Sequence, residues 1–210
     1  MMIIVLANEN LKMELLAQGV SENVAIHWIT EPKELLHYRD ADAYIDLLFQ
    51  NDSERIKLLQ QLQPKPILIN AVIPALNQLP GDFIRFNGWN TFLKRPVIEA
   101  AGIDEKIKSK AEEIFSLFNK KAEWVTDVPG FISARVIAMI INEAWFALSE
   151  KVSTKEEIDI AMKLGTNYPY GPFEWSEKIG LKNVYELLFT LSKTSTRYEP
   201  AGLLKKEVFK

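Results

Sequence analysis

Polar and aromatic side chains are concentrated in one short segment, F-I-R-F-N-G-W-N-T-F-L-K-R-P at residues 83–96. Cationic and amide groups donate hydrogen bonds to anions, and an indole ring stacks on planar groups. We therefore predict a site for an anionic or planar ligand, formed by Arg85, Asn87, Trp89, Asn90 and Lys94. The alternative is that Trp89 and Phe92 fill internal volume while the basic side chains of the segment face solvent.

Few side chains are available for nucleophilic, acid–base or metal chemistry. The 210 residues contain no cysteine, which excludes disulfides, thiol nucleophiles and thiolate metal sites. His27 and His37 are the two histidines, too few for a histidine-rich metal site. We interpret both as surface or satisfied core residues and predict no metal site.

The turn after the first predicted strand reads A-N-E-N-L-K at residues 7–12. A dinucleotide needs glycines in this turn, because its pyrophosphate approaches bare backbone at a helix N-terminus. No glycine is present, and the Glu9 carboxylate would repel phosphates. We therefore expect no cofactor. Glu31, just past the second predicted strand, is a candidate for bonding a cofactor ribose; alternatively it caps a helix or faces solvent.

Composition and charge describe a globular chain with a substantial core, since 48% of the residues are hydrophobic and 25% are charged. The net charge of -3 and the pI near 5.6 argue against a nucleic-acid partner. The start M-M-I-I-V-L-A-N-E-N lacks the basic residues of a signal peptide, and no apolar run is long enough to span a bilayer. We expect a cytoplasmic protein with no membrane partner.

Up to about residue 100 short β-type runs alternate with helical patterns, which predicts an α/β layer with a mainly parallel sheet. The predicted strands cover residues 3–6, 24–29, 43–49, 67–72 and 83–87, and a short strand at 122–126 closes the sheet. A helix is clearest at 53–62, where Pro64 and Pro66 stop it.

From residue 103 the apolar residues recur at helical spacing, first over 106–119. We predict a helix from 130 to about 150 that is apolar nearly all round, with Pro129 in its first turn. Such a helix must be buried on several sides, at the centre of a helical domain or of a subunit interface.

Thr154-x-x-Glu157 predicts a capping box at the start of the next helix, and Gly165 is the predicted end. Further helices fit 173–179 and 183–191. Between them, the Y-P-Y-G-P-F-E run predicts a tight loop in which Tyr168 and Phe173 pack.

Three segments carry a family resemblance: D-V-P-G-F-I-S-A-R at 127–135, D-I-A-M-K-L-G-T-N-Y-P-Y-G-P-F-E at 159–174 and R-Y-E-P-A-G-L-L-K-K-E-V at 197–208. They resemble the C-terminal domain of the 3-hydroxyacyl-CoA dehydrogenase family, enzymes of fatty acid metabolism that pass a hydride between an acyl-CoA alcohol and NAD. The resemblance implies a helical domain at 127–210, like the C-terminal domain of 6-phosphogluconate dehydrogenase, with acyl-CoA contacts and a homodimer interface. Residues 1–126 resemble the family's Rossmann-like domain in a shortened form.

The sequence departs from the family at the positions that the resemblance makes catalytic. The family's general base is the histidine of H-F-F-N-P, and the counterpart I-R-F-N-G at 84–88 has none. Arg85 cannot replace it, because a guanidinium stays protonated. The serine position falls in N-A-V-I at 70–73, the asparagine position is Ala134, and Glu99 is the nearest equivalent of the glutamate. We predict no catalytic residue.

Three hypotheses remain open. In the first, the protein is a catalytically degenerate family member, a pseudoenzyme that binds an acyl-CoA-like ligand as a homodimer. In the second, it is an active NAD-dependent 3-hydroxyacyl-CoA oxidoreductase with altered catalytic residues. In the third, it is a purely structural module for dimerisation or partner binding.

Overall fold

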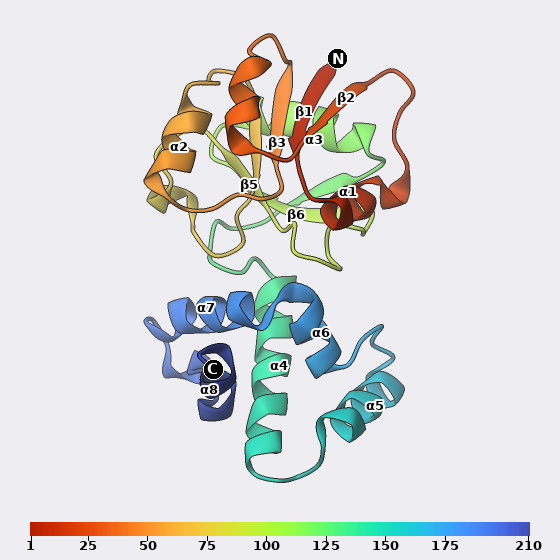
Figure 1. Cartoon of the computed structure of the whole chain (residues 1–210), viewed down its shortest axis with the longest axis vertical. Helices are drawn as coiled ribbons and strands as arrows, with labels where there is room; N and C mark the ends of the chain where they lie inside the picture. Colours follow the sequence, from red (N-terminus) through yellow and green to blue (C-terminus); the bar gives the residue numbers. More distant parts are fainter. The chain divides into compact units, whose positions relative to one another are not determined.

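The computed structural model describes all 210 residues, which form two compact units, Met1–Phe131 and Ile132–Lys210. Figure 1 shows a sheet with helices on it in the first unit and helices alone in the second. The predicted fold class, a shortened Rossmann-like sheet followed by a helical domain, is confirmed. Residues 127–131, the start of the first family motif, belong to the sheet-containing unit.

The sheet has seven strands in the order β2-β1-β3-β4-β5-β6-β7. All neighbours run parallel except β5 and β6, which are antiparallel. A doubly wound dinucleotide-binding sheet has the order 3-2-1-4-5-6, and removal of its third strand gives the order 2-1-3-4-5 seen here. The shortening therefore leaves β2 as an edge strand. The strands are β1 (Met2–Leu6), β2 (Ala25–Ile29), β3 (Ala43–Asp46), β4 (Ile67–Asn70), β5 (Ile84–Phe86), β6 (Val97–Ala101) and β7 (Lys121–Trp124).

Strand β1 is buried on both faces, which explains its continuous apolar sequence. Ile3 and Val5 point into a core covered by α1 (Glu9–Leu15) and α3 (Glu105–Leu117). Ile4 and Leu6 point into a second core, covered by the 3₁₀ helix η2 (Pro32–His37) and by α2 (Ser53–Gln60). The first unit thus has three layers, and the carboxyl end of β1 lies in its interior.

The five predicted strands of the first half are confirmed, but β3 ends at Asp46 and not at residue 49, because a turn follows. Strand β6 was not predicted. Its sequence V-I-E-A-A is short and lacks a clear alternation, and its strand character comes from pairing with β5 and β7. Helix α2 and the closing strand β7 are confirmed.

Helix α4 (Ser133–Ser149) is the centre of the second unit, as its apolar sequence predicts. It packs against α6 (Pro172–Ile179), α7 (Leu181–Ser192) and α8 (Gly202–Val208), while α5 (Lys155–Thr166) packs against α6 (Figure 1). The closing segment is tied to α4 by Asn142, which donates to the Glu199 carbonyl and accepts from the Ala201 amide. None of the helices has the length and apolar character needed to span a bilayer.

Two predicted helix ends were wrong. Helix α4 does not begin at residue 130, because Gly130 and Phe131 have left-handed backbone angles, with φ of 85° and 50°. Helix α5 continues through Gly165 and stops at Asn167, whose φ of 56° is the left-handed conformation of a helix C-terminus. The predicted capping box is confirmed, since Thr154 Oγ1 accepts from the Glu157 amide at 3.2 Å and Glu157 accepts from the Thr154 amide.

Candidate functional site

Arg85, the first residue of the predicted ligand group, lies in the interior of the sheet-containing unit and has no exposed surface. Its Nη1 donates to Asp127 Oδ1 at 2.6 Å, and its Nε donates to the Ala71 carbonyl at 2.9 Å. Its Nη2 donates to the carbonyls of Val72 and Val128 at 3.0 and 3.2 Å. The guanidinium therefore holds protein groups on all sides, and a ligand could bind it only after these bonds break.

The same contacts define the electrostatics of Arg85. Its guanidinium lies 4.2 Å from the centre of the Phe131 ring, so one face is covered by an aromatic side chain. Burial lowers the pKa of Arg85, and the hydrogen bond and charge of Asp127 oppose that shift. The residue at the counterpart of the family's general base is thus a buried structural cation.

The rest of the predicted ligand group is divided between interior and surface. Asn87 is 2% exposed and donates to Glu99 Oε2 at 3.0 Å. Trp89 and Phe92 are buried, which supports the alternative that they fill internal volume. Asn90 and Lys94 are half-buried, at the edge of the same loop.

Residues that the sequence did not single out hold this loop in place. Glu14 of α1 accepts the Thr91 amide with both carboxylate oxygens, at 2.7 and 2.8 Å. Buried Lys120 donates to the carbonyls of Leu93 and Arg95 at 2.6 and 3.0 Å. Burial lowers the pKa of Lys120 to about 8, and the Glu14 charge opposes the shift. No sequence pattern distinguishes these two residues from ordinary surface charges.

Asn70 holds the beginning of the loop, in the segment where the family has its serine. Its Nδ2 donates to the carbonyls of Leu47 and Gly88, both at 3.1 Å, and its Oδ1 accepts the Gly88 amide at 3.0 Å. A Cβ at position 88 would lie 2.8 Å from Asn70 Cγ, so glycine is required there by the close approach. The counterparts of the family's serine and histidine segments are thus joined by structural hydrogen bonds.

In the turn between β1 and α1, the side chain of Asn8 occupies the N-terminus of the helix. Asn8 is the N-cap of α1, and its Oδ1 accepts the Leu11 amide at 2.9 Å. Glu9 points to solvent and pairs with Lys12 at 3.3 Å. A carboxamide and a carboxylate therefore lie where a glycine turn would present bare amides to phosphates.

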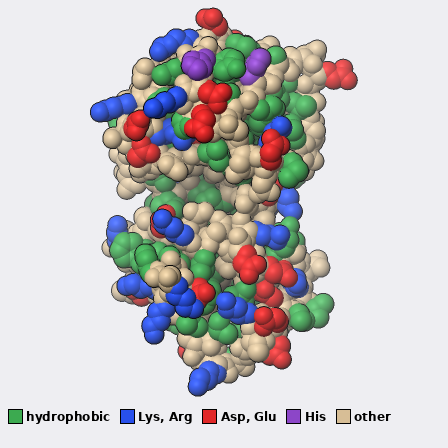
Figure 2. Space-filling model, in the orientation of Figure 1, with side chains coloured by type: hydrophobic (Ala, Val, Ile, Leu, Met, Phe, Trp, Pro, Cys, Tyr) green, Lys and Arg blue, Asp and Glu red, His purple; other side chains and the backbone are tan.

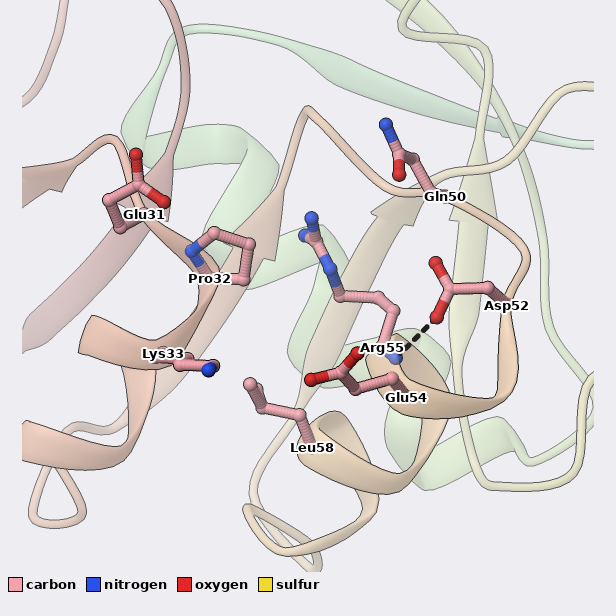
Figure 3. Close-up of a pocket in the computed structure, with 8 residues that line it drawn as sticks. All are labelled: Glu31, Pro32, Lys33, Gln50, Asp52, Glu54, Arg55 and Leu58. Atoms are coloured by element: carbon pink, nitrogen blue, oxygen red, sulfur yellow. Dashed lines mark hydrogen bonds between the residues drawn. The ribbon is translucent and has the colours of Figure 1, made fainter.

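Glu31 lies on the rim of a cavity of about 460 Å³ at the carboxyl ends of β2 and β3 (Figure 3). The remaining lining residues come from the start of η2 and from α2 with its preceding loop: Pro32, Lys33, Gln50, Asp52, Glu54, Arg55 and Leu58. Arg55 Nη1 donates to buried Asp46 Oδ2 at 2.6 Å. Burial raises the pKa of Asp46 to about 6, although the Arg55 charge opposes the shift.

The Y-P-Y-G-P-F-E run joins α5 to α6. Asp159 of α5 accepts the amides of Phe173 and Glu174 at 2.8 and 3.1 Å, and so caps α6. Glu174 in turn accepts the Gly171 amide at 3.0 Å and a hydrogen bond from Lys163. These contacts confirm the interpretation of this run as a tight structural loop.

The aromatic side chains of the run complete the loop. The Tyr168 ring lies 5.3 Å from the Trp175 ring and the Phe173 ring lies 5.3 Å from the Trp145 ring, both edge to face. Such pairs contribute about 0.5–1.5 kcal/mol beyond their burial. Both predicted residues therefore pack in the helical unit, Phe173 buried in its core and Tyr168 half-buried.

Comparison with known proteins identifies this helical unit. Residues 130–209 match the family model described as 3-hydroxyacyl-CoA dehydrogenase, C-terminal domain. The 3-hydroxyadipyl-CoA dehydrogenase of Escherichia coli (strain K12) is 43% identical over 83 residues, 39% of this chain and 18% of that protein. The 3-hydroxybutyryl-CoA dehydrogenase of Bradyrhizobium diazoefficiens is 26% identical over 220 residues, 96% of this chain and 75% of that protein. The helical unit therefore belongs to the family of 3-hydroxyacyl-CoA dehydrogenase C-terminal domains.

The fold of the family extends through both units. The (S)-3-hydroxybutyryl-CoA dehydrogenase from Ralstonia eutropha is similar with a TM-score of 0.75 over 99% of this chain and 93% of that chain, at 20% identity. At the positions that the resemblance assigns to the base and the asparagine this chain has buried Arg85 and Ala134, and Asn8 caps the helix after β1.

Proposed function

We propose that this protein does not transfer hydride and instead binds an acyl-CoA-like ligand as a homodimer. The observation that carries the proposal is the complete burial of Arg85, whose three side-chain nitrogens each donate to a protein atom. A guanidinium accepts no proton at working pH. Loss of general acid–base help removes about 3 to 5 kcal/mol of transition-state stabilisation.

The absence of NAD binding is part of the same proposal. Asn8 supplies the cap that an anion would supply at the N-terminus of α1, and the Glu9 carboxylate adds repulsion. A dinucleotide would have to displace the Asn8 cap and approach Glu9 in the same turn.

The names of similar proteins support an acyl-CoA-like ligand. The E. coli and Bradyrhizobium relatives are both named for CoA thioesters. The best-preserved part of this chain is the helical unit, to which the family resemblance attributes acyl-CoA contacts. Asn90 and Lys94 are the members of the predicted ligand group that retain exposed surface.

Homodimerisation is supported by exposed apolar side chains on the helical unit. Val136 of α4, and Ile160 and Leu164 of α5, are between half and more than four-fifths exposed. Figure 2 shows hydrophobic side chains protruding over α5. Apolar side chains on a solvent-facing helix indicate a surface that another protein covers.

A thermal-shift titration with NADH, NADPH and acetoacetyl-CoA tests the proposal, because a ligand that binds the native state raises its melting temperature. We expect stabilisation by acetoacetyl-CoA alone. Stabilisation by a dinucleotide together with acetoacetyl-CoA reduction would establish the active oxidoreductase instead. No response to any of the three compounds would favour the third hypothesis, a purely structural module for dimerisation or partner binding.

A further inference from the structure

Strand β2 is an open edge of the seven-stranded sheet. It pairs with β1 on one side and has no strand on the other (Figure 1). The Ala25 amide and the Ile29 carbonyl bond to the chain at the two ends of β1, with N···O distances of 2.9 and 3.1 Å. Successive main-chain groups of a strand point to opposite sides, so the amides and carbonyls of Ile26 and Trp28 point away from β1.

This edge lacks the features that protect natural edge strands from pairing with another chain. Its sequence A-I-H-W-I contains no lysine and no proline, and its register with β1 is continuous, so it has no bulge. In the doubly wound order 3-2-1-4-5-6 the second strand is internal, because the third strand covers its outer side. Strand β2 has the second position without that cover, and its outward amides and carbonyls are available to another strand.

The side chains of β2 divide between the two faces of the sheet, as the pleat of a strand requires. Ile26 and Trp28 are half-buried and pack against the core that α1 and α3 cover. Ala25 and His27 are exposed on the opposite face. The edge therefore presents two partly exposed apolar side chains on one face and a small and a polar side chain on the other.

A second copy of this edge is complementary to the first. An antiparallel pair with its two-fold axis at His27 would place Ile26 of each copy opposite Trp28 of the other, where the two residues exchange both N–H···O bonds. Ala25 would lie opposite Ile29, so the whole strand is paired. An aromatic side chain opposite a β-branched one is a favourable cross-strand pair. Moving the two-fold axis by one residue would leave two residues of each strand unpaired.

We infer that β2 is a self-association surface, through which two copies join their sheets by antiparallel β2–β2 pairing. The inference goes beyond the proposed function, because this surface lies on the sheet-containing unit and not on α5. Two short strands bury little area, and interfaces below roughly 1,200 Å² are weak, so we expect the pairing at concentrations on the order of 100 µM. Dimers formed through the helical unit would then assemble through β2 into tetramers or open chains.

Sedimentation equilibrium of the full-length protein between about 5 and 500 µM tests the inference, because the mass should rise two-fold or more over this range. His27→Lys and His27→Glu each place like charges opposite each other at the two-fold axis, and each should weaken the association about ten-fold or more. An equal mixture of these two variants pairs opposite charges there and should recover it. His27→Thr adds no charge and is the matched control, which should associate like the parent protein.

Ile26→Pro is an independent test, because it removes an amide that points away from β1, and proline is tolerated on the outer side of an edge strand. It should abolish the association and keep a parental circular dichroism spectrum. If this variant does not fold, the exposed His27 side chain still provides the test.

Three results would overturn the inference. They are a parent protein whose mass stays constant over the whole concentration range, an unchanged association in both charged His27 variants, and no recovery in their mixture. The mass at the lowest concentration reports the helical-unit dimer separately. A protein that is monomeric there and doubles its mass at high concentration would retain the β2 pairing and refute the proposed dimer.

Discussion

Arg85 and Asp127 are 42 residues apart in the sequence and form an ion pair of 2.6 Å inside the sheet-containing unit. Asp127 uses its second oxygen to accept the Leu76 amide at 2.9 Å. Three residues further, Gly130 donates to the Val72 carbonyl at 2.8 Å. The pair therefore fastens the D-V-P-G-F motif to the segment after β4.

The first prediction concerns this pair. Arg85→Met should lower the free energy of unfolding by about 3–5 kcal/mol, because two buried carbonyls, the part-buried Val128 carbonyl and Asp127 lose their donor. Asp127→Asn should cost about as much, roughly 3–5 kcal/mol, because it leaves the fully buried Arg85 guanidinium without a counter-charge. Urea denaturation of both variants and the double variant measures the coupling, and additive effects would show that the ion pair is not a unit.

Replacement of Arg85 by histidine should not restore dehydrogenase activity. A histidine at this position would be enclosed by the same carbonyls, and the α1 turn still lacks glycine. The measurement is NADH oxidation with acetoacetyl-CoA, monitored by absorbance. Turnover above that of the parent protein would contradict this prediction, because it would show that the missing base alone prevents dehydrogenase activity.

Two glycines of the helical unit should respond in opposite directions. A Cβ at Gly171 would lie 2.3 Å from the Asp159 carboxylate, so Gly171→Ala must displace the cap of α6 and cost about 1–3 kcal/mol. Gly165 lies within α5 with no atom inside 4 Å of an added Cβ, so Gly165→Ala should stabilise by up to about 1 kcal/mol. Thermal unfolding compares the two, and equal effects would contradict the role given to Asp159.

Asp46 should make stability pH-dependent between about pH 4 and 6. Burial raises its folded-state pKa to about 6, above the unfolded value of 3.8, so the folded state binds more protons in this range. Its contribution is therefore greatest at low pH and falls as pH rises through 6, by on the order of 3 kcal/mol. Since asparagine does not titrate, the free energy of unfolding of the parent should fall relative to that of Asp46→Asn between pH 4 and 6. Above pH 6 the difference between the two proteins should stay flat. A gap that is constant from pH 4 to 7 would refute this.

The exposed apolar residues of α5 predict the location of a dimer interface. Leu164→Glu should shift the mass measured by light scattering from dimer to monomer, because a carboxylate would be buried without a partner. Ile103→Glu changes a similarly exposed apolar residue, 81% exposed, in the other unit and should leave the mass unchanged. A parent protein that is monomeric at micromolar concentration would exclude the dimer altogether.

Sequence alone identified the family, the central strand β1, the apolar helix α4 and the loss of the glycine turn and the histidine. Each of these depends on residue types at short, fixed spacing, and such spacing is set by the local geometry of helices, strands and turns. Asp159 and Gly171 lie in the 159–174 segment that carried the family resemblance, so their spacing could also be recognised from the sequence.

The tertiary structure decided what the replaced residues do. Arg85 has the composition of a ligand contact, and only the approach of Asp127 and Val128, more than 40 residues away, makes it a buried structural cation. Glu14 and Lys120 likewise become loop anchors through partners that are distant in sequence. Whether a charged side chain meets solvent, a ligand or a buried partner depends on long-range packing, which residue type and local spacing do not specify.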